Sequence, residues 1–336
     1  MHFYLHSFSD RIFLITLALL AAVVAGGALH LHRVLLLDRP ATIACAFFAG
    51  MERKLNRPGR AAGTRRLRGV LLVVVTWAGC MGVGWLVGGL SETSPWGMGL
   101  EVALLTLGLP IGEGYAQARS VQRAFGDKEN ARGFALVAPL ARRDDMPSDM
   151  HMALRSMVEY LALHFSRRTV APVFWYVALG LPAMLFVAAL GVMDRTFGSR
   201  ASVYASFGAA AARLDDIAQI VPARIAALLF AVAASCAPGC NPGRALRGMA
   251  AGAGKTVSPN NGVVLGAVAG ALGVALAGPR AFKGVPIPDA WIDFGTAKLA
   301  LVHLARMNYL YLCAVCLLTV GVAAMNIRDF SFPLSP

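Results

Sequence analysis

Several segments of this chain are apolar over the length that a helix needs to cross a membrane. A spanning helix requires about 20 consecutive apolar residues. The segments that come closest to this length are residues 12–30, 69–89, 170–193 and 308–325. A soluble domain does not expose such segments to water, so the sequence predicts an all-α, polytopic integral membrane protein.

The composition supports this fold class. Hydrophobic residues make up 57% of the chain and charged residues only 15%, whereas soluble domains have about 25% charged residues. These values exclude a typical cytosolic enzyme, a disordered tail and a disulfide scaffold. The chain also contains 35 glycines, and small residues allow membrane helices to approach one another closely.

Weaker apolar segments raise the predicted number of transmembrane or re-entrant helices to about five to seven. We expect a short interfacial helix in residues 34–50, a weak span in residues 98–112, a short dipping helix in residues 225–237 and a packed or re-entrant helix in residues 261–278. Pro182 is expected to kink the long apolar segment that contains it. Residues 12–30 are interpreted as an uncleaved anchor because a second apolar segment follows at once.

Positive charge is concentrated in two loops. Lys and Arg outnumber Asp and Glu by 31 to 18, which gives a net charge of +13. Residues 53–68 and 117–169 carry much of this charge, and the intervening turn at residues 91–96 has no Lys or Arg. Cationic loops stay on the cytoplasmic face and contact anionic lipids. We therefore predict a multi-pass protein of the cell membrane, in bacteria the inner membrane.

No nucleic-acid binding is expected, because no basic run alternates with aromatic residues that would stack on bases.

No internal repeat or low-complexity segment divides the chain, so a single membrane domain over residues 1–336 is predicted. Within it we expect N-terminal spans in residues 1–116, a polar cytoplasmic loop domain in residues 117–169, and C-terminal spans with motif-bearing loops in residues 170–336.

Three clusters of polar residues lie beside apolar helices, where an unpaired polar group is costly. The clusters comprise residues 142–145 with the following Arg155 and Glu159, residues 194–195 with 213–216 and 222–224, and residues 258–262. The carboxylates of Asp215 and Asp216 are ligands of the type that Mg²⁺ prefers, together with a nucleotide. The same two residues also suit a salt-bridged helix end at the lipid headgroup layer.

Familiar catalytic and nucleotide-binding patterns are not complete in this sequence. Residues 252–256 read Gly-Ala-Gly-Lys-Thr, but the earlier glycine and the preceding strand of a phosphate-binding loop are missing, so a flexible linker is predicted. The sequence also has no Ser/His/Asp set, zinc-spaced histidine cluster or dinucleotide fingerprint.

Short motifs follow one another in a specific order along the chain. They are Met-Glu-Arg-Lys-Leu-Asn-Arg at residues 51–57, Val-Ala-Pro-Val-Phe-Trp at 170–175, Ala-Arg-Leu-Asp-Asp at 212–216, Pro-Ala-Arg at 222–224 and Ser-Pro-Asn at 258–260. In this combination the sequence resembles the CobD/CbiB family of cobalamin biosynthesis from residue 39 to about residue 284. That family consists of integral membrane adenosylcobinamide-phosphate synthases, and the sequence is also distantly similar to AmpE.

The resemblance implies an ATP-dependent ligase that joins aminopropanol phosphate to the corrinoid adenosylcobyric acid. ATP and Mg²⁺ would be its cofactors, and membrane lipid and other proteins of the cobalamin pathway its partners. The catalytic residues implied are Arg143, Asp144, Glu159, Asp194, Arg213, Asp215, Asp216 and Arg224. Ser258, Pro259, Asn260 and Pro172 would bind substrate, and Asp215 and Asp216 would bind Mg²⁺.

The chain departs from the family's motifs at several positions. Leu163 and His164 stand where the family has Glu and Asn, and Arg167 stands where it has Asp. Gly191 and Arg195 replace a further Asn and a Ser. Gln219, Thr256 and Leu265 stand where the family has Asn, His and Glu.

Because acids and amides are lost at these positions, an alternative is a catalytically degenerate member that acts as a membrane scaffold or an AmpE-like regulatory protein. A transporter is disfavoured, because the sequence has no paired broken helices in symmetric halves.

Overall fold

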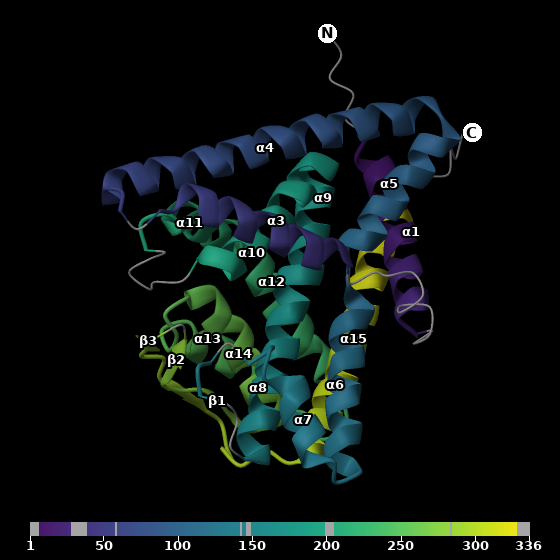
Figure 1. Ribbon diagram of the computed structural model, residues 1–336. Coiled ribbons are helices and arrows are strands. Elements are labelled where there is room, and N and C mark those ends of the chain that lie inside the picture. The colour runs from purple at the N-terminus through teal and green to yellow at the C-terminus, as the bar shows by residue number, and fades with distance from the viewer. Residues whose placement is uncertain are drawn as a thin grey trace, which may run out of the picture.

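The computed structural model describes residues 7–27, 39–57, 59–141, 143–145, 149–198, 205–282 and 284–327. The part of the predicted interfacial helix at residues 34–38, the end of the first predicted span at residues 28–30, and Arg142 lie outside these residues. The described chain is mostly helical, as predicted, with four short strands. Figure 1 shows one long helix lying across the top of the molecule, with the other helices gathered below it.

The upper part of Figure 1 contains α1 (Phe8–Gly27), α3 (Arg39–Leu55), α4 (Ala62–Thr93), α5 (Pro95–Gly108), α9 (Ala171–Leu179), α10 (Leu181–Phe197) and α11 (Ala209–Ala218). The lower part contains α6 (Ile111–Gly126), α7 (Asn130–Val137), α8 (Met150–Phe165), α13 (Pro242–Gly252) and α14 (Pro259–Leu272). The π-helical turn η1 (Ser166–Val170) joins α8 to α9. α12 (Ile220–Ala233) lies between the two parts, and α15 (Leu301–Ile327) runs along both.

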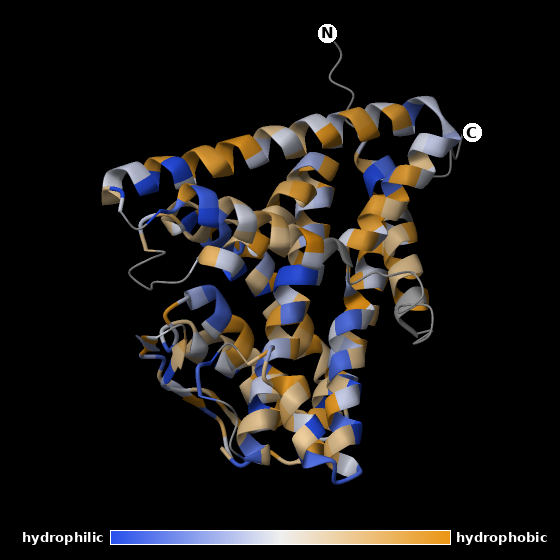
Figure 2. Ribbon diagram, in the orientation of Figure 1, coloured by the Kyte–Doolittle hydropathy of each residue, from blue (hydrophilic) through white to orange (hydrophobic). Residues whose placement is uncertain are grey.

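Two described helices are long and apolar enough to cross a membrane, namely α4 and residues 301–325 of α15. A third span is possible if α11 and α12, which meet at a bend of 47°, are counted as one broken span. Large apolar side chains of α4 and α5 are exposed, including Leu86 (74% exposed) and Trp96 (88% exposed). Figure 2 shows hydrophobic residues concentrated in the upper helices and hydrophilic ones in the lower part. An apolar surface of this extent requires a covering environment such as lipid.

The long apolar segment at residues 170–193 is broken at Gly180 rather than kinked at Pro182. Gly180 has a φ of 81°, and it ends α9 and precedes the first residue of α10. Pro182 lacks the N–H that a continuous helix would need, so it lies in the first turn of a new helix. Glycine adopts the positive φ at little cost, and the chain therefore turns just before the proline.

Residues 117–169, predicted as a polar loop, form helices and are partly central to the fold. The residues belong to the end of α6, α7, α8 and most of η1. In α8, Leu154, Met157, Leu161 and Phe165 recur at intervals of three and four and are fully buried. This spacing places them on one face of the helix, which packs against α6, α14 and α15.

Four strands that the sequence did not predict follow α14. Strands β1 (Ala275–Ala277) and β4 (Trp291–Asp293) pair antiparallel, as do β2 (Arg280–Phe282) and β3 (Val285–Ile287). The predicted helix over residues 261–278 is therefore wrong in its last part, because Gly273 adopts a left-handed conformation and ends α14. The Arg155 guanidinium of α8 lies 4.7 Å from the Trp291 ring centroid, and this contact holds the sheet against α8.

Glycines bring α13 and α14 into backbone contact. Gly248 and Gly252 on α13 face Gly262, Gly266 and Gly270 on α14, and both sets repeat every four residues. A Cβ atom added at any of them would overlap a backbone carbonyl of the partner helix. Small residues at this spacing are typical of close helix pairs in membrane proteins.

Gly266→Ala is expected to lower the free energy of unfolding by about 1–3 kcal/mol, because the new methyl group overpacks the contact with Gly248. Denaturant-induced unfolding in detergent measures this change. Gly321→Ala is the matched control, since a Cβ at this helical glycine of α15 meets nothing within 4 Å. The same loss of stability in both variants would contradict the proposed contact.

Candidate functional site

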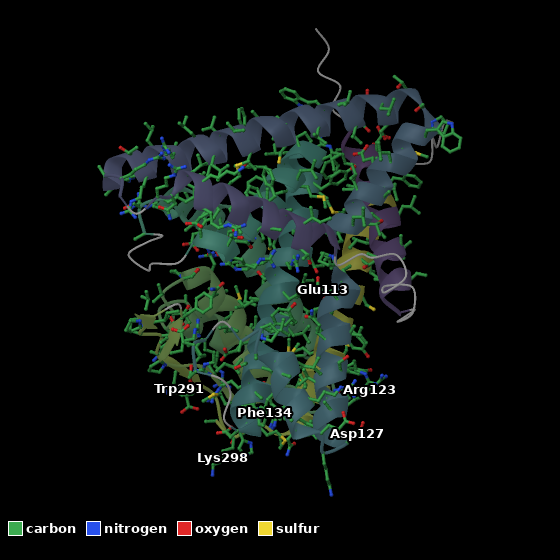
Figure 3. The ribbon with its side chains drawn as sticks, viewed as in Figure 1. Glu113, Arg123, Asp127, Phe134, Trp291 and Lys298 are labelled. Atoms are coloured by element: carbon green, nitrogen blue, oxygen red, sulfur yellow. The ribbon has the colours of Figure 1, made fainter. Side chains whose placement is uncertain are left out.

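A cavity of about 550 Å³ lies where the upper and lower helices meet. Its walls come from α3, α5, α6, α8, η1, α9, α10, the start of α14 and β2. Glu113, labelled in Figure 3, lies near the middle of the molecule and lines this cavity. The volume is in the range of pockets that enclose small ligands.

One face of α8 supplies much of the polar wall. Ser156, Glu159, Tyr160, Leu163 and His164 all line the cavity. Their spacing of three and four residues places them on one side of the helix, opposite the apolar face that packs into the core. The amphipathic character of α8 therefore follows from its position between the core and the cavity.

The π-helical turn η1 continues α8 and directs two arginines to different partners. The Arg167 Nη1 atom lies 2.7 Å from Asp215 Oδ2 and 3.6 Å from Asp194 Oδ2. Its Nε donates to Asn261 Oδ1 over 3.3 Å. The next residue, Arg168, turns to α6, where its Nη1 lies 3.1 Å from Glu113 Oε2. Single π turns within α-helices are frequent at functional sites.

Glu159 is half-buried, and its carboxyl is held in a fixed position. Its Oε1 accepts a hydrogen bond of 2.8 Å from the backbone N–H of Ala277. Ala277 has a φ of 63°, a strained value for a residue other than glycine. Burial raises the pKa of Glu159, although the Arg280 charge and the Ala277 hydrogen bond act in the opposite direction. Glu159 is therefore suited to exchange a proton nearer to neutral pH than an ordinary glutamate.

The sequence motifs of α11, α12 and α14 come together beside the cavity. Asp216 Oδ1 accepts from Ser258 Oγ over 2.9 Å, and Asn260 Nδ2 donates to the Asp216 carbonyl over 2.7 Å. Arg224 Nη1 donates to Asn260 Oδ1 over 3.3 Å. Four of the residues implied by the resemblance are thus joined in one hydrogen-bonded group.

Asp215 and Asp216 do not face the same ligand position in this arrangement. Consecutive residues of a helix point in different directions, and here Asp215 meets Arg167 while Asp216 meets Ser258. Among the described residues, no group of three or more His, Cys, Asp or Glu side chains is placed to hold a metal ion. Asp215 is 1% exposed, and its nearest cation is the Arg167 guanidinium. The two carboxylates therefore do not fit a paired Mg²⁺ site.

The remaining residues implied by the resemblance are more dispersed. Pro172 lines the cavity, Pro259 and Arg213 are exposed, and Asp194 lies beside Arg167. Arg143 pairs with Asp145 over 3.3 Å. The Asp144 carboxylate accepts from the N–H of Gly284 over 2.7 Å, and this contact places it at the hairpin of β2 and β3.

Several cavity residues were not predicted as site residues. They are Glu113, His164, Arg167, Arg168, Arg195 and Arg280. Glu113, His164 and Arg280 are single polar residues, and Arg195 was grouped with Asp194 instead, so no spacing pattern marks the six as a group. The available signal was the charge pair Arg167-Arg168 immediately before a long apolar segment, where charges need partners.

These features define a helical membrane protein with a cavity that carries charged side chains on its walls. The family described as CobD/Cbib protein matches residues 15–311, and the chain belongs to this family. It is 31% identical to the cobalamin biosynthesis protein CobD of Rhizobium meliloti over 278 residues. This match covers 82% of this chain and 85% of the relative. It is 32% identical over 304 residues to CobD of Rhodobacter capsulatus, covering 87% of this chain and 90% of the relative. No solved structure matches the chain.

The comparisons favour a role in cobalamin biosynthesis over the regulatory alternative, since these relatives carry the name of that pathway. Five of the positions at which the chain departs from the family's motifs lie together. Leu163, His164, Arg167, Gly191 and Arg195 all line the cavity. Gln219, Thr256 and Leu265 do not line it, so the departures are not confined to one site.

Arg167→Met is expected to cost about 3–5 kcal/mol of folding free energy, because it leaves the Asp215 carboxylate buried without its cation. The double variant R167M/D215N removes both charges and is expected to recover part of this loss. Unfolding in detergent measures both. Arg132→Ala breaks an exposed pair with Glu129 and serves as the control, with a change of about 1 kcal/mol or less. No difference between R167M and R132A would contradict a structural role for the Arg167 pair.

Proposed function

We propose that this protein is the ATP-dependent ligase that joins aminopropanol phosphate to adenosylcobyric acid and forms adenosylcobinamide phosphate. The observation that carries the proposal is the cavity with two carboxyl groups and four arginines on its walls. Amide formation between an acid and an amine phosphate needs cations for the acidic groups and a base for the amine. Membership of the CobD/Cbib family supports this substrate assignment.

The reaction consists of two successive displacement steps. A carboxylate oxygen of the corrinoid takes the γ-phosphoryl group of ATP, and ADP leaves. The amine nitrogen of aminopropanol phosphate then attacks the activated carbonyl carbon, the C–N bond forms, and inorganic phosphate leaves. The nitrogen loses a proton in this step, so a base must lie inside the site.

We assign the role of this base to Glu159. Its carboxyl is held by the Ala277 N–H and lines the cavity. Burial raises its pKa, which makes it a stronger base than an exposed glutamate. The arginines on the cavity walls would neutralise phosphate and carboxylate groups as they approach.

The cavity volume suits the small amine rather than the whole corrinoid. A cavity of about 550 Å³ is of the size that encloses a drug-like molecule. A corrinoid macrocycle with its amide side chains is larger, so only its reacting side chain would enter.

ATP and Mg²⁺ are cofactors in this proposal by family membership. Asp215 already has Arg167 as its cation, so no step of the reaction is assigned to a metal ion at that residue. Mg²⁺ commonly reaches a protein on the phosphates of its nucleotide. Asp216, Ser258, Asn260 and Arg224 form the polar group beside the cavity that would meet such a nucleotide.

We further propose that the chain is a multi-pass protein of the bacterial inner membrane, with about five to seven transmembrane or re-entrant segments. The two apolar helices and the exposed apolar residues of α4 and α5 support this location. After expression in bacteria, the protein is expected to stay in the membrane pellet through an alkaline carbonate wash. Release into the supernatant would contradict the proposed location.

Purified protein in nanodiscs is expected to form an amide product from adenosylcobyric acid, aminopropanol phosphate, ATP and Mg²⁺, as measured by mass spectrometry. Glu159→Gln keeps the shape of the side chain but removes the base, and kcat is expected to fall by about 10²–10⁴-fold. In the wild type, kcat should decrease as the pH falls through the raised pKa of Glu159, at a higher pH than an ordinary glutamate would give. This decrease in kcat at acidic pH should be absent from E159Q.

Glu129→Gln, at an exposed position of the α6–α7 connection, is the matched control and should retain wild-type kcat. An amide product formed at the same rate by wild type and E159Q would exclude Glu159 as the base. No product from the wild type, under conditions in which another family member is active, would refute the ligase assignment.

A further inference from the structure

The cavity has one wall with polar groups that lack partners. His164 is 3% exposed, and neither ring nitrogen has a hydrogen-bond partner among the described residues. Arg195 Nε is likewise buried without a partner, and no carboxylate of the described residues pairs with this arginine. Both side chains line the cavity. Buried donors without partners are costly, so this wall is suited to a ligand that supplies acceptors.

The charge on this wall favours an anion. Arg168 lies close enough to His164 and Arg195 to repel the positive charge of both. Arg168 forms an ion pair with Glu113 at 3.1 Å, whereas Arg195 has no carboxylate partner among the described residues. Burial and the two arginines lower the pKa of His164 well below its ordinary value. A neutral imidazole keeps one N–H to donate beside the guanidinium groups.

We propose that Arg195, His164 and Arg168 form a binding site for the phosphate group of a phosphate monoester. A guanidinium group presents paired N–H donors that match phosphate oxygens. The other walls are largely apolar, with Phe48 and Leu140 among them. A small organic phosphate thus satisfies the orphaned donors and fills the remaining space.

The position of this site relative to Glu159 orients the ligand. Glu159 precedes His164 by five residues on the cavity face of α8, which is about 7.5 Å along the helix axis. A short amino alcohol phosphate has its amine and its phosphate at opposite ends. Phosphate at His164 and Arg195 therefore directs the amine toward Glu159. This part rests on the proposed function, whereas the phosphate site itself does not.

Calorimetry of purified protein in phosphatidylcholine nanodiscs tests the site without turnover. The probes are aminopropanol phosphate, the same amino alcohol without phosphate, and inorganic phosphate. The wild type is expected to bind the phosphate ester at least tenfold more tightly than the alcohol. Arg195→Gln should weaken binding of the ester and of inorganic phosphate by about tenfold or more, and leave binding of the alcohol unchanged. Arg195→Lys should recover part of this affinity because it restores the charge.

Arg123→Gln is the matched control, since Arg123 lies on the exposed surface of α6 away from the cavity (Figure 3). Unfolding of each variant in detergent shows whether R195Q is folded, and His164→Gln gives a second, uncharged probe of the same wall. Equal affinity of wild type and R195Q for the ester, or an equal loss for ester and alcohol, would overturn the site.

A lipid headgroup is a second source of the same chemistry. Nanodiscs that contain phosphatidic acid distinguish the two sources. If this lipid competes with the ester in the wild type and not in R195Q, the site is supported with the lipid as an occupant. If it does not compete, the soluble ester is the ligand.

Failure of this site is distinguishable from failure of the ligase assignment. Arg195-dependent phosphate binding without amide formation would refute the assignment and keep the site. Amide formation by R195Q with an unchanged KM for aminopropanol phosphate would refute the site and keep the assignment.

Discussion

The ion pair between Arg167 and Asp215 is the interaction on which the centre of this protein depends. It connects the end of α8 with α11, and the same guanidinium group also reaches Asp194 of α10 and Asn261 of α14. Four segments that are distant in sequence are thereby fixed around one cation. A carboxylate as buried as Asp215 would otherwise be costly, so the position of η1 is coupled to the placement of the helices around it.

The π turn explains how neighbouring residues serve separate parts of the molecule. In η1, Arg167 turns to the polar motifs of α11 and α14, while Arg168 turns to Glu113 on α6. The cavity lies between these two directions. Arg167 lines the cavity and also contacts Asp215 and Asn261, so its side chain connects the cavity wall to the helices that carry the polar motifs.

Much of the helical fold and the grouping of the Ser-Pro-Asn and Pro-Ala-Arg motifs could be predicted from the sequence. Apolar length indicates helices, and the family resemblance implied that the motif residues belong to one site. The break at Gly180 and the strands after Gly273 depend on positive φ values at single glycines, which no hydrophobic pattern reveals. Likewise, the divergence of Asp215 from Asp216 follows from helix geometry and from the position of Arg167, which only tertiary structure supplies.

The glycine contact between α13 and α14 has a consequence for how this protein can evolve. Where two side chains meet, enlargement of one can be offset by reduction of the other. Here each glycine meets a main-chain carbonyl, and a carbonyl cannot be made smaller by any substitution. The helix pair next to Ser258 and Asn260 therefore cannot accept a larger residue at these glycines unless one helix backbone moves.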